Sequence, residues 1–184
     1  MAHHQHGHRP AASGTAGQDP VAEHKAAGKT TARCLVVTIS DSRTMETDRS
    51  GARIAELLEE AGHSVAARRI IPDEPDQIRA LLTTACSDSA IDAVITSGGT
   101  GLAPRDVTTE VVEDVLTRRL DGFGELFRML SFEEIGSAAM LSRAVGGLAG
   151  DTMIFALPGS SKAVELGITR LVAPELGHIL GLIR

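Results

Sequence analysis

The sequence predicts a three-layer α/β fold in which helices cover both faces of a mostly parallel β-sheet. Short apolar runs rich in β-branched residues alternate along the chain with segments of helical periodicity, which is the pattern of repeated strand-helix-strand units. The strand-like runs are apolar at nearly every position, as expected of strands buried on both faces. A Gly-Asp pair between two further apolar runs adds a C-terminal β-hairpin. We therefore expect one domain, spanning residues 33–184.

The first half of this domain is predicted to contain strands and helices in strict alternation. Strands are predicted at residues 34–40, 64–71 and 92–96, and helices at 50–63, 72–86 and 106–120. Ser50 is the expected N-cap of the first helix and Gly62 its expected end, while Asp106 or Thr108 is expected to cap the third helix. Right-handed crossovers through these helices place consecutive strands parallel to one another.

The carboxyl-terminal part departs from this alternation. Residues 144–159 contain two strand-like runs around Gly150 and Asp151, which predicts the hairpin. Residues 160–183 return to helical periodicity, with a break or kink expected at Pro174.

The first 32 residues have a composition that cannot support a folded core. They are rich in Ala, Gly, His and Pro and contain almost no large apolar side chain, so they bury too little surface to offset the entropy lost on ordering. We expect a disordered tail whose histidines form only a weak metal site without fixed geometry: His3, His4, His6 and His8. The tail lacks the apolar stretch of a secretory signal, and no later apolar run reaches membrane-spanning length. These features predict a cytoplasmic protein without a membrane partner.

Charge and aromatic content argue against a nucleic-acid partner. The formal net charge is −6, and the chain has no Trp, no Tyr and four Phe, whereas nucleic-acid binding needs a basic surface and, for single strands, stacking side chains. Phe123, Phe127 and Phe132 are expected in the core or in a subunit contact instead. Cys34 and Cys86 fall in apolar parts of a strand and a helix, so we expect two reduced thiols rather than a disulfide or a metal pair.

The stretch "VITSGGTGLAPRD" at residues 94–106 predicts a loop that binds an anion or a polar ring. Gly98, Gly99 and Gly101 allow positive φ values and a close backbone approach, so that successive N–H groups can converge on a ligand. Two known nucleotide loops do not fit, because no Lys-Ser or Lys-Thr pair follows the last glycine and because the dinucleotide glycine spacing is absent. Ser97 and Thr100 add hydroxyl groups to the same loop.

Polar residues follow the predicted strands at their carboxyl ends, where open α/β sheets bind their ligands. The parallel strands are followed by Asp41, Asp73 and Asp106, and the hairpin is followed by Ser160, Ser161 and Lys162. Each aspartate taken alone fits a loop or cap residue equally well. Together, however, they would repel an anion unless a divalent cation intervened. Mg²⁺ binds one or two carboxylates together with phosphate oxygens during phosphoryl or nucleotidyl transfer, so we expect a magnesium-nucleotide site.

No histidine falls in these loops. His63 follows a helix and His178 lies on the last helix, where we expect surface or packing roles, and no Ser-His-Asp triad is visible. A phosphate that attacks another phosphate is already ionised and gains mainly from positioning and metal electrostatics. Such a reaction needs no histidine.

Taken together, these motifs resemble the MogA/MoaB family of molybdenum-cofactor biosynthesis proteins, which includes the G domains of gephyrin and of the plant cofactor-synthesis proteins. The resemblance covers nearly all of residues 34–184 and keeps the family's order of motifs: "TISDSR", "RRIIPDE", "ITSGGTGLAPRDVTTEVVE", "GFGELFRMLSFEEIGSAAMLSRAV" and "FALPGSSKA". It implies the molybdopterin-binding fold of that family. It also implies that molybdopterin, a pterin with a dithiolene and a terminal phosphate, is adenylylated by Mg-ATP with release of pyrophosphate.

The resemblance further implies roles for individual residues. Asp73 and Asp106 match the family's two essential acids, which serve Mg²⁺ and ATP. The other matching residues are expected to bind the substrates: Ser40, Asp41, Ser97, Gly98, Gly99, Thr100, Gly101, Glu125, Ser160, Ser161 and Lys162. Glu125 and Lys162 also fit purely structural roles, as an acid near a helix N-terminus and a solvated helix residue. Members of the family are usually trimers or hexamers, so a homo-oligomer is implied, and other molybdenum-cofactor enzymes are candidate partners.

Two features resemble the MoaB branch more than the MogA branch: the segment "FRMLSFEEIGS" and the end of the chain at Arg184. Some members of the MoaB branch adenylylate molybdopterin, but catalysis is not guaranteed in bacteria that also carry a MogA protein. A non-catalytic molybdopterin-binding or scaffold protein is therefore the alternative hypothesis. An unrelated ATP-binding regulatory domain is a third hypothesis, which the series of motifs disfavours.

Overall fold

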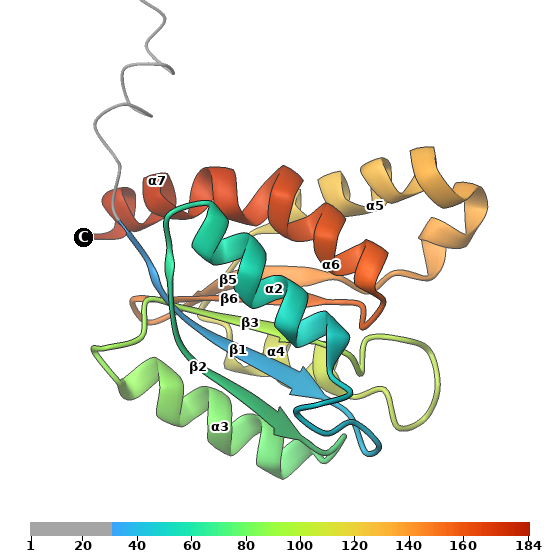
Figure 1. Cartoon of the computed structure of the whole chain (residues 1–184), viewed down its shortest axis with the longest axis horizontal. Helices are drawn as coiled ribbons and strands as arrows, with labels where there is room; N and C mark the ends of the chain where they lie inside the picture. Colours follow the sequence, from blue (N-terminus) through green and yellow to red (C-terminus); the bar gives the residue numbers. More distant parts are fainter. Residues whose placement is uncertain (1–30) are drawn as a thin grey trace, which may run out of the picture.

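The computed structural model describes residues 31–184, which form a six-stranded sheet covered by helices on both faces (Figure 1). The strand order is β2-β1-β3-β6-β5-β4. This arrangement confirms the predicted three-layer α/β fold, its mostly parallel sheet and its C-terminal hairpin. The predicted disordered tail and its four histidines lie outside the described residues, except that Ala32 is fully buried in the core.

Four neighbouring strands run parallel, from the β2 edge of the sheet inward: β2 (Ser64–Ile71), β1 (Arg33–Ile39), β3 (Ala93–Ser97) and β6 (Thr152–Leu157). Strand β1 pairs with β2 on one side and with β3 on the other, and β3 pairs with β6. Thr38 lies opposite Ser97, and Ser97 lies opposite Leu157, so these three strands end at the same edge of the sheet. The loops that follow them are therefore brought together.

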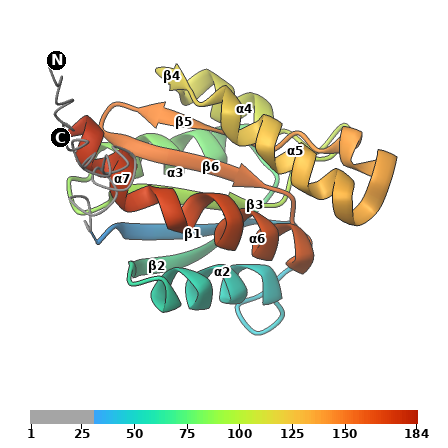
Figure 2. The same ribbon diagram turned by 90° about the horizontal axis from the view of Figure 1, so that it is seen from above.

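The helices divide between the two faces of the sheet (Figure 2). One face carries α3 (Pro75–Ser87) and α4 (Thr108–Val115), and the other carries α2 (Arg49–Glu60), α5 (Asp121–Ile135), α6 (Ser161–Gly167) and α7 (Ala173–Ile183). Alternate residues of β1 contribute to the two cores, since Val36 packs with the α2 side and Val37 with the α3 side. Burial on both faces explains why the strand sequence is continuously apolar.

The C-terminal hairpin joins β5 (Val145–Ala149) to β6 through Gly150 and Asp151. Gly150 has a φ of 63°, which suits the first central position of a type II′ turn. The hairpin extends the sheet, because β4 (Arg118–Arg119) pairs antiparallel with the outer edge of β5. The sequence placed residues 118–120 in a helix, and this prediction is wrong: α4 ends at Val115 because the backbone beyond it donates hydrogen bonds to β5 instead.

The helix ends differ from the predicted caps at two places. Asp48, rather than Ser50, is the N-cap of α2, since its Oδ1 accepts a hydrogen bond of 2.9 Å from the backbone N–H of Gly51. Helix α4 begins at Thr108 without any side-chain cap, so the cap predicted at Asp106 or Thr108 is also wrong. Gly62 has a φ of 88° directly after α2 and ends that helix as predicted.

The last helix is continuous but irregular. Between α6 and α7 lies a π-helical segment, η2 (Ile168–Val172), directly before Pro174. The predicted break thus takes the form of a wider turn, which accommodates a residue that lacks a backbone N–H. The whole stretch Ser161–Ile183 is long and apolar enough to cross a membrane by length and composition, which corrects the expectation that no segment reaches that length. Its apolar face nevertheless packs into the core beside α2, through residues such as Leu176 and Leu180.

The aromatic and sulfur side chains follow the predictions closely. Phe123 and Phe127 are buried, whereas Phe132 is 61% exposed. Cys34 is buried and Cys86 half-buried, and both thiols are free. Burial raises the pKa of the Cys34 thiol to about 12, so this thiol is a poor nucleophile.

The two histidines of the domain lie away from the glycine-rich loop. The Nδ1 atom of His63 accepts a hydrogen bond of 3.2 Å from the backbone N–H of Ala32, and its Nε2 lies 3.2 Å from the carbonyl oxygen of Ala173. His178 contacts Glu175 within the last helix. Both therefore have the packing or surface roles that the sequence predicted.

Candidate functional site

The glycine loop, which we define as residues 98–106, leaves β3 at the edge where the parallel strands end. Gly98 and Gly99 have φ values of 102° and 64°, a region that side chains rarely adopt. A Cβ atom on Gly98 would also lie 2.3 Å from the carbonyl oxygen of Ile39 at the end of β1. The sequence therefore needs glycine here both for the turn and for close contact with the neighbouring strand.

Two aspartates lie against the next glycines of the loop. A Cβ atom on Gly99 would lie 2.7 Å from Oδ1 of Asp73, and one on Gly101 would lie 2.5 Å from Oδ2 of Asp106. The Oδ2 atom of Asp106 accepts a hydrogen bond of 3.0 Å from the backbone N–H of Ala103, which fixes this carboxylate within the loop. The structure thus brings Asp73 and Asp106 to the same loop, although they are 33 positions apart in the sequence.

Asp73 has an unusual environment. Its Oδ1 atom is buried and has no hydrogen-bond partner among the described residues. Burial raises the pKa of the Asp73 carboxyl above its usual range, and the nearby carboxylates of Asp41 and Asp106 raise it further, against an opposing effect of Arg105. An unpaired, partly desolvated carboxylate oxygen is costly unless a ligand satisfies it. Perturbed carboxyl groups of this kind are typical of binding and catalytic sites.

A cavity of about 460 Å³ opens beside the glycine loop. Its walls come from the loop, from the carboxyl end of α5 with the 3₁₀ helix that follows, and from the turn after β6. The predicted site residues among its lining are Gly98, Gly99, Thr100, Gly101, Asp106 and Ser160. A cavity of this size has room for part of a nucleotide or pterin.

The first predicted motif lies beside this cavity rather than in its wall. Asp41 accepts a hydrogen bond of 3.2 Å from the backbone N–H of Asp73 through Oδ1, so the first and second loops are joined directly. Ser40 is half-buried, and its hydroxyl accepts a hydrogen bond of 3.3 Å from the backbone N–H of Ser42. Ser97 is fully buried below the loop, within 3.5 Å of the hydroxyl of Thr38. Ser40 and Ser97 therefore support the loops from beneath.

The turn after β6 contributes one of its three predicted residues to the cavity. Ser160 is the N-cap of α6, and its hydroxyl accepts a hydrogen bond of 3.2 Å from the backbone N–H of Ala163. Gly159 comes close to Gly98, since a Cβ atom on Gly159 would lie 3.3 Å from the Cα of Gly98. Ser161 and Lys162 are exposed and do not line the cavity.

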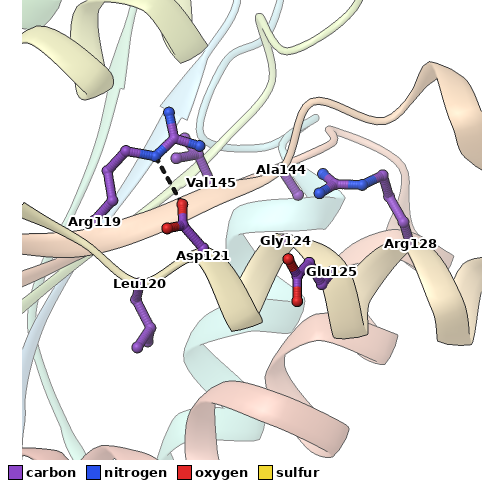
Figure 3. Close-up of a pocket in the computed structure, with 8 residues that line it drawn as sticks. All are labelled: Arg119, Leu120, Asp121, Gly124, Glu125, Arg128, Ala144 and Val145. Carbon is purple, nitrogen blue, oxygen red and sulfur yellow. Dashed lines mark hydrogen bonds and ion pairs between the residues drawn. The ribbon is translucent and has the colours of Figure 1, made fainter.

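Glu125 lies in a different pocket (Figure 3). This cavity, of about 310 Å³, lies between the start of α5 and the start of β5, and is lined by Arg119, Leu120, Asp121, Gly124, Glu125, Arg128, Ala144 and Val145. Arg119 pairs with Asp121, as the dashed line shows, and also with Glu113. Within one chain the structure therefore does not bring Glu125 to the glycine loop.

Two arginines that the sequence analysis did not single out hold the site together. Arg105 pairs with Asp41 at 2.9 Å and with Glu74 at 3.0 Å, and donates a hydrogen bond of 3.3 Å to the carbonyl oxygen of Asp73. Arg143 donates hydrogen bonds to the carbonyl oxygens of Thr100 and Asp106. Both arginines fall within the motifs that resemble the family, in "APRD" and "LSRAV". Arg105 directly precedes Asp106, which is a local signal, whereas Arg143 is 37 positions from Asp106 and no neighbouring residue marks it.

The acids of the site fit a divalent cation that shares its ligands with phosphate. The unpaired Oδ1 of Asp73 and the carboxylate of Asp106 are oxygen donors of the type that Mg²⁺ prefers. No group of three or more His, Cys, Asp and Glu side chains within residues 31–184 gathers closely enough to hold a metal by itself. Mg²⁺ typically uses only one or two carboxylates together with substrate phosphates, so this donor set suits a magnesium-nucleotide complex.

Comparisons with known proteins identify the family of this chain. A family model described as a probable molybdopterin binding domain matches residues 35–178. Molybdenum cofactor biosynthesis protein B of Halalkalibacterium halodurans is 50% identical over 161 residues, which cover 87% of this chain and 95% of that protein. A crystal structure of molybdenum cofactor biosynthesis protein B superposes with a TM-score of 0.82 at 49% identity, covering 84% of this chain and 96% of the other.

A structure of MogA is a more distant relative. It superposes with a TM-score of 0.75 at 32% identity and covers 83% of this chain and 99% of the other. The higher identity to protein B agrees with the resemblance to the MoaB branch. The family model spans most of the described domain, and the relatives cover nearly their full lengths. The chain therefore belongs to the molybdopterin-binding domain family of molybdenum cofactor biosynthesis proteins.

Proposed function

We propose that this chain transfers the adenylyl group of Mg-ATP to the terminal phosphate of molybdopterin and releases pyrophosphate. The observation that carries this proposal is the buried, unpaired Oδ1 of Asp73, which lies against Gly99 of the glycine loop. Asp73 does not line the cavity of about 460 Å³ itself, but Gly99 and Asp106 do, and the carboxylate of Asp106 is close enough to raise the pKa of Asp73. Membership of a molybdenum cofactor biosynthesis family supplies the acceptor, molybdopterin.

The reaction requires the two substrates to be aligned but no protein base. An ionised phosphate oxygen of molybdopterin attacks the α-phosphorus of ATP and forms a new P–O bond. The bond from the α-phosphorus to the oxygen that bridges to the β-phosphate breaks, and its electron pair leaves with pyrophosphate. The described loops after β1, β2, β3 and β6, which form the site, contain no histidine. This agrees with such a mechanism, because the nucleophile is already ionised.

The residues of the site divide these tasks. Backbone N–H groups of the glycine loop orient phosphate oxygens, as successive N–H groups do in other anion sites. Asp73 and Asp106 would hold the magnesium-nucleotide complex, and the turn at Ser160 forms another wall of the cavity that Asp106 lines. The Mg²⁺ ion, when bound, neutralises charge on the phosphates during transfer.

The test is turnover. Purified protein is incubated anaerobically with molybdopterin and Mg-ATP, and adenylylated molybdopterin and pyrophosphate are followed by chromatography against a heat-denatured control. Multiple turnovers are expected from the wild type. Asp106→Asn retains an oxygen that can accept from Ala103 but loses the charge, and we expect at least a hundredfold loss of turnover. Asp114→Asn is the matched control, because Asp114 is an exposed acid of α4 that pairs with Arg79 away from the cavity. Full activity of Asp106→Asn would remove Asp106 from the mechanism.

A non-catalytic molybdopterin-binding or scaffold protein of the same pathway is the second candidate. It is favoured by the pairing of two site acids with Arg105, which occupies their carboxylates. It requires that molybdopterin bind without release of pyrophosphate, while an active relative turns over in the same buffer. That result would replace the adenylyltransferase proposal.

We also propose that copies of the chain associate through the outer side of α5 and the 3₁₀ helix after it, η1 (Gly136–Leu141). Large apolar side chains are exposed there to between 46% and 78%: Leu126, Met129, Phe132, Ile135, Met140 and Leu141. Such a patch usually marks an interface. Light scattering coupled to size-exclusion chromatography should give a trimer or hexamer for the wild type and a smaller species for Phe132→Asp. Leu182→Asp, on α7, is the control, because Leu182 is 70% exposed outside the patch.

A further inference from the structure

Arg105 joins the three loops that carry the acids of the site. Its Nη2 lies 2.9 Å from Oδ2 of Asp41 in the loop after β1, and 3.0 Å from Oε1 of Glu74 after β2. The same nitrogen donates a hydrogen bond of 3.3 Å to the carbonyl oxygen of Asp73. Arg105 itself belongs to the glycine loop after β3. One guanidinium therefore links the carboxyl ends of three neighbouring strands.

The charge around this arginine is strongly unbalanced. We call Asp41, Asp73, Glu74 and Asp106 the acid cluster. Within the part of the chain that the structure describes, Arg105 is the only Lys or Arg side chain that forms an ion pair with any member of this cluster. Four carboxylates thus share a single ion-paired cation, while Arg143, the other cation at the glycine loop, donates to the carbonyl oxygens of Thr100 and Asp106.

The exposure of Arg105 argues against a mainly structural role. Its side chain is 59% exposed, and those of Asp41 and Glu74 are 47% and 48% exposed. Ion pairs between exposed side chains contribute little to stability because water screens them. The side chain can therefore leave its partners at small cost, and the solvent around it leaves space to reorient.

We propose that Arg105 is an exchangeable counter-ion of the acid cluster, which leaves Asp41 and Glu74 when a divalent cation binds at Asp73 and Asp106 and then binds the polyphosphate of the nucleotide. This inference rests on the proposed function, since it concerns how the same site selects its substrate. Arg105 pairs with the carboxylates of Asp41 and Glu74 and acts electrostatically on Asp73. Its guanidinium repels a cation at Asp73 and Asp106, so Arg105 opposes binding of the free metal. A guanidinium also matches phosphate oxygens in a bidentate manner, so the released side chain favours a metal that arrives with phosphate.

The exchange gives the site a preference for the complex of metal and nucleotide over either component. Free metal must overcome the repulsion of Arg105 without any compensating contact. Free nucleotide meets four carboxylates with only one paired cation. The complex supplies positive charge to the acids and negative charge to Arg105 at once. Arg105 is therefore a specificity-determining residue, which acts at the binding step.

Binding measurements without molybdopterin test this role, because no turnover is involved. Mn²⁺ serves as the probe for the free cation, with unbound Mn²⁺ measured by electron paramagnetic resonance. ATP with excess Mg²⁺ serves as the probe for the complex, measured by isothermal titration calorimetry. For Arg105→Gln we expect about tenfold tighter binding of Mn²⁺ alone and about tenfold weaker binding of Mg-ATP. Arg105→Lys keeps the charge but not the planar fork, so it should hold the Mn²⁺ affinity near the wild-type value and still weaken Mg-ATP binding.

Arg79→Gln is the matched control for the change of net charge. Arg79 is also an exposed arginine, with 45% of its side chain accessible, and it pairs with Asp114 at 2.9 Å outside the acid cluster. Both affinities should stay within about twofold of the wild type in this variant, because salt screens distant charges. Circular dichroism and thermal unfolding of each variant verify that the fold is retained.

The outcomes separate this inference from the proposed function. Opposite shifts of the two affinities in Arg105→Gln, absent from Arg79→Gln, support the exchange. Equal weakening of both ligands, or no change in either, overturns it while leaving adenylyl transfer intact as long as the wild type binds both probes. If the wild type binds neither Mn²⁺ nor Mg-ATP, the proposed function fails and the counter-ion role fails with it.

Discussion

The Nη2 atom of Arg143 donates a hydrogen bond of 2.6 Å to the carbonyl oxygen of Asp106 at the end of the glycine loop. The Nε atom of the same side chain donates one of 3.2 Å to the carbonyl oxygen of Thr100. Its Nη1 atom pairs with Glu110 on α4. A single side chain, three quarters buried, thus holds two backbone points of the loop and ties them to the helix that follows.

Replacement of Arg143 by alanine should therefore loosen the loop. We expect at least a tenfold loss of adenylyl transfer and faster hydrogen exchange at residues 100–106, since two charge-assisted hydrogen bonds are lost. The free energy of unfolding should fall by about 2 kcal/mol. Glu110→Gln is the control, because it removes the ion pair while Arg143 still donates to both carbonyl oxygens. An equal loss of activity in Glu110→Gln would assign the effect to the ion pair rather than to the loop.

Gly99 should not tolerate even an alanine. Its φ is 64°, and a Cβ atom would lie 2.1 Å from Oγ1 of Thr108 and 2.7 Å from Oδ1 of Asp73. We expect Gly99→Ala to destabilise the protein by about 3 kcal/mol, from backbone strain together with the clash, and to abolish nucleotide binding.

Gly62 offers a control for the backbone part of this cost. It has a φ of 88° at the end of α2, but a Cβ atom there would meet nothing within 4 Å. Gly62→Ala should cost only about 1–2 kcal/mol, because alanine is strained in the left-handed conformation. Urea unfolding of both variants gives the difference. Equal losses would show that the space beside Asp73 and Thr108 is not restricted.

Local sequence patterns specified the sheet and the main helices because the two periodicities are strong. The apolar run of β1 and the turn at Gly150 can each be recognised from neighbouring residues alone, and the structure contains both as predicted. The edge strand β4 was missed because two residues carry no periodicity, and its pairing with β5 is a contact between distant segments. The N-cap of α2 was misplaced because Asp48 and Ser50 are both good caps, and Arg68, a distant residue, pairs with Asp48.

The site shows the same division between local and distant information. The glycines of the loop and the acids after each strand were recognisable from spacing and from the rule that ligands bind at strand carboxyl ends. The links between the loops were not recognisable, because they join residues far apart in the sequence. The partners of Arg105 are between 31 and 64 positions away, and those of Arg143 are between 33 and 43 positions away. The position of Glu125 in a separate pocket likewise depends on how α5 packs against β5.

Asp92 should account for part of the loss of stability in acid. Its carboxylate is buried, and burial alone would raise its pKa, but hydrogen bonds from Arg33 and Arg184 outweigh this effect and lower the pKa to about 2. The resulting stabilisation is present above the unfolded-state pKa and is lost as the pH falls through about 2. We expect Asp92→Asn to lose about 3 kcal/mol at pH 7, because it leaves the arginines unpaired. Urea unfolding should show this difference shrinking between pH 4 and pH 2, and a difference that stays constant over that range would contradict it.

Asp73 should behave in the opposite way. Burial and the carboxylates of Asp41 and Asp106 raise the pKa of Asp73 in the folded state. The folded protein therefore holds this proton more tightly than the unfolded chain does. Its contribution to stability is therefore complete below the unfolded-state pKa and is lost as the pH rises through the folded-state value. At pH 7 the ionised carboxylate destabilises the fold, and Asp73→Asn should raise the melting temperature by about 2–4 °C, or roughly 1 kcal/mol.

The same substitution should abolish adenylyl transfer, so that stability and activity change in opposite directions. Differential scanning calorimetry from pH 3 to pH 8 measures the first effect, and the gain in melting temperature should disappear near pH 3. Asp114→Asn provides the comparison, since Asp114 is an exposed acid that pairs with Arg79 and its removal should give no gain at pH 7. A stable, inactive Asp73→Asn protein would mean that Asp73 serves ligand binding and lowers the stability of the folded protein. A destabilised one would mean that its carboxylate supports the loops instead.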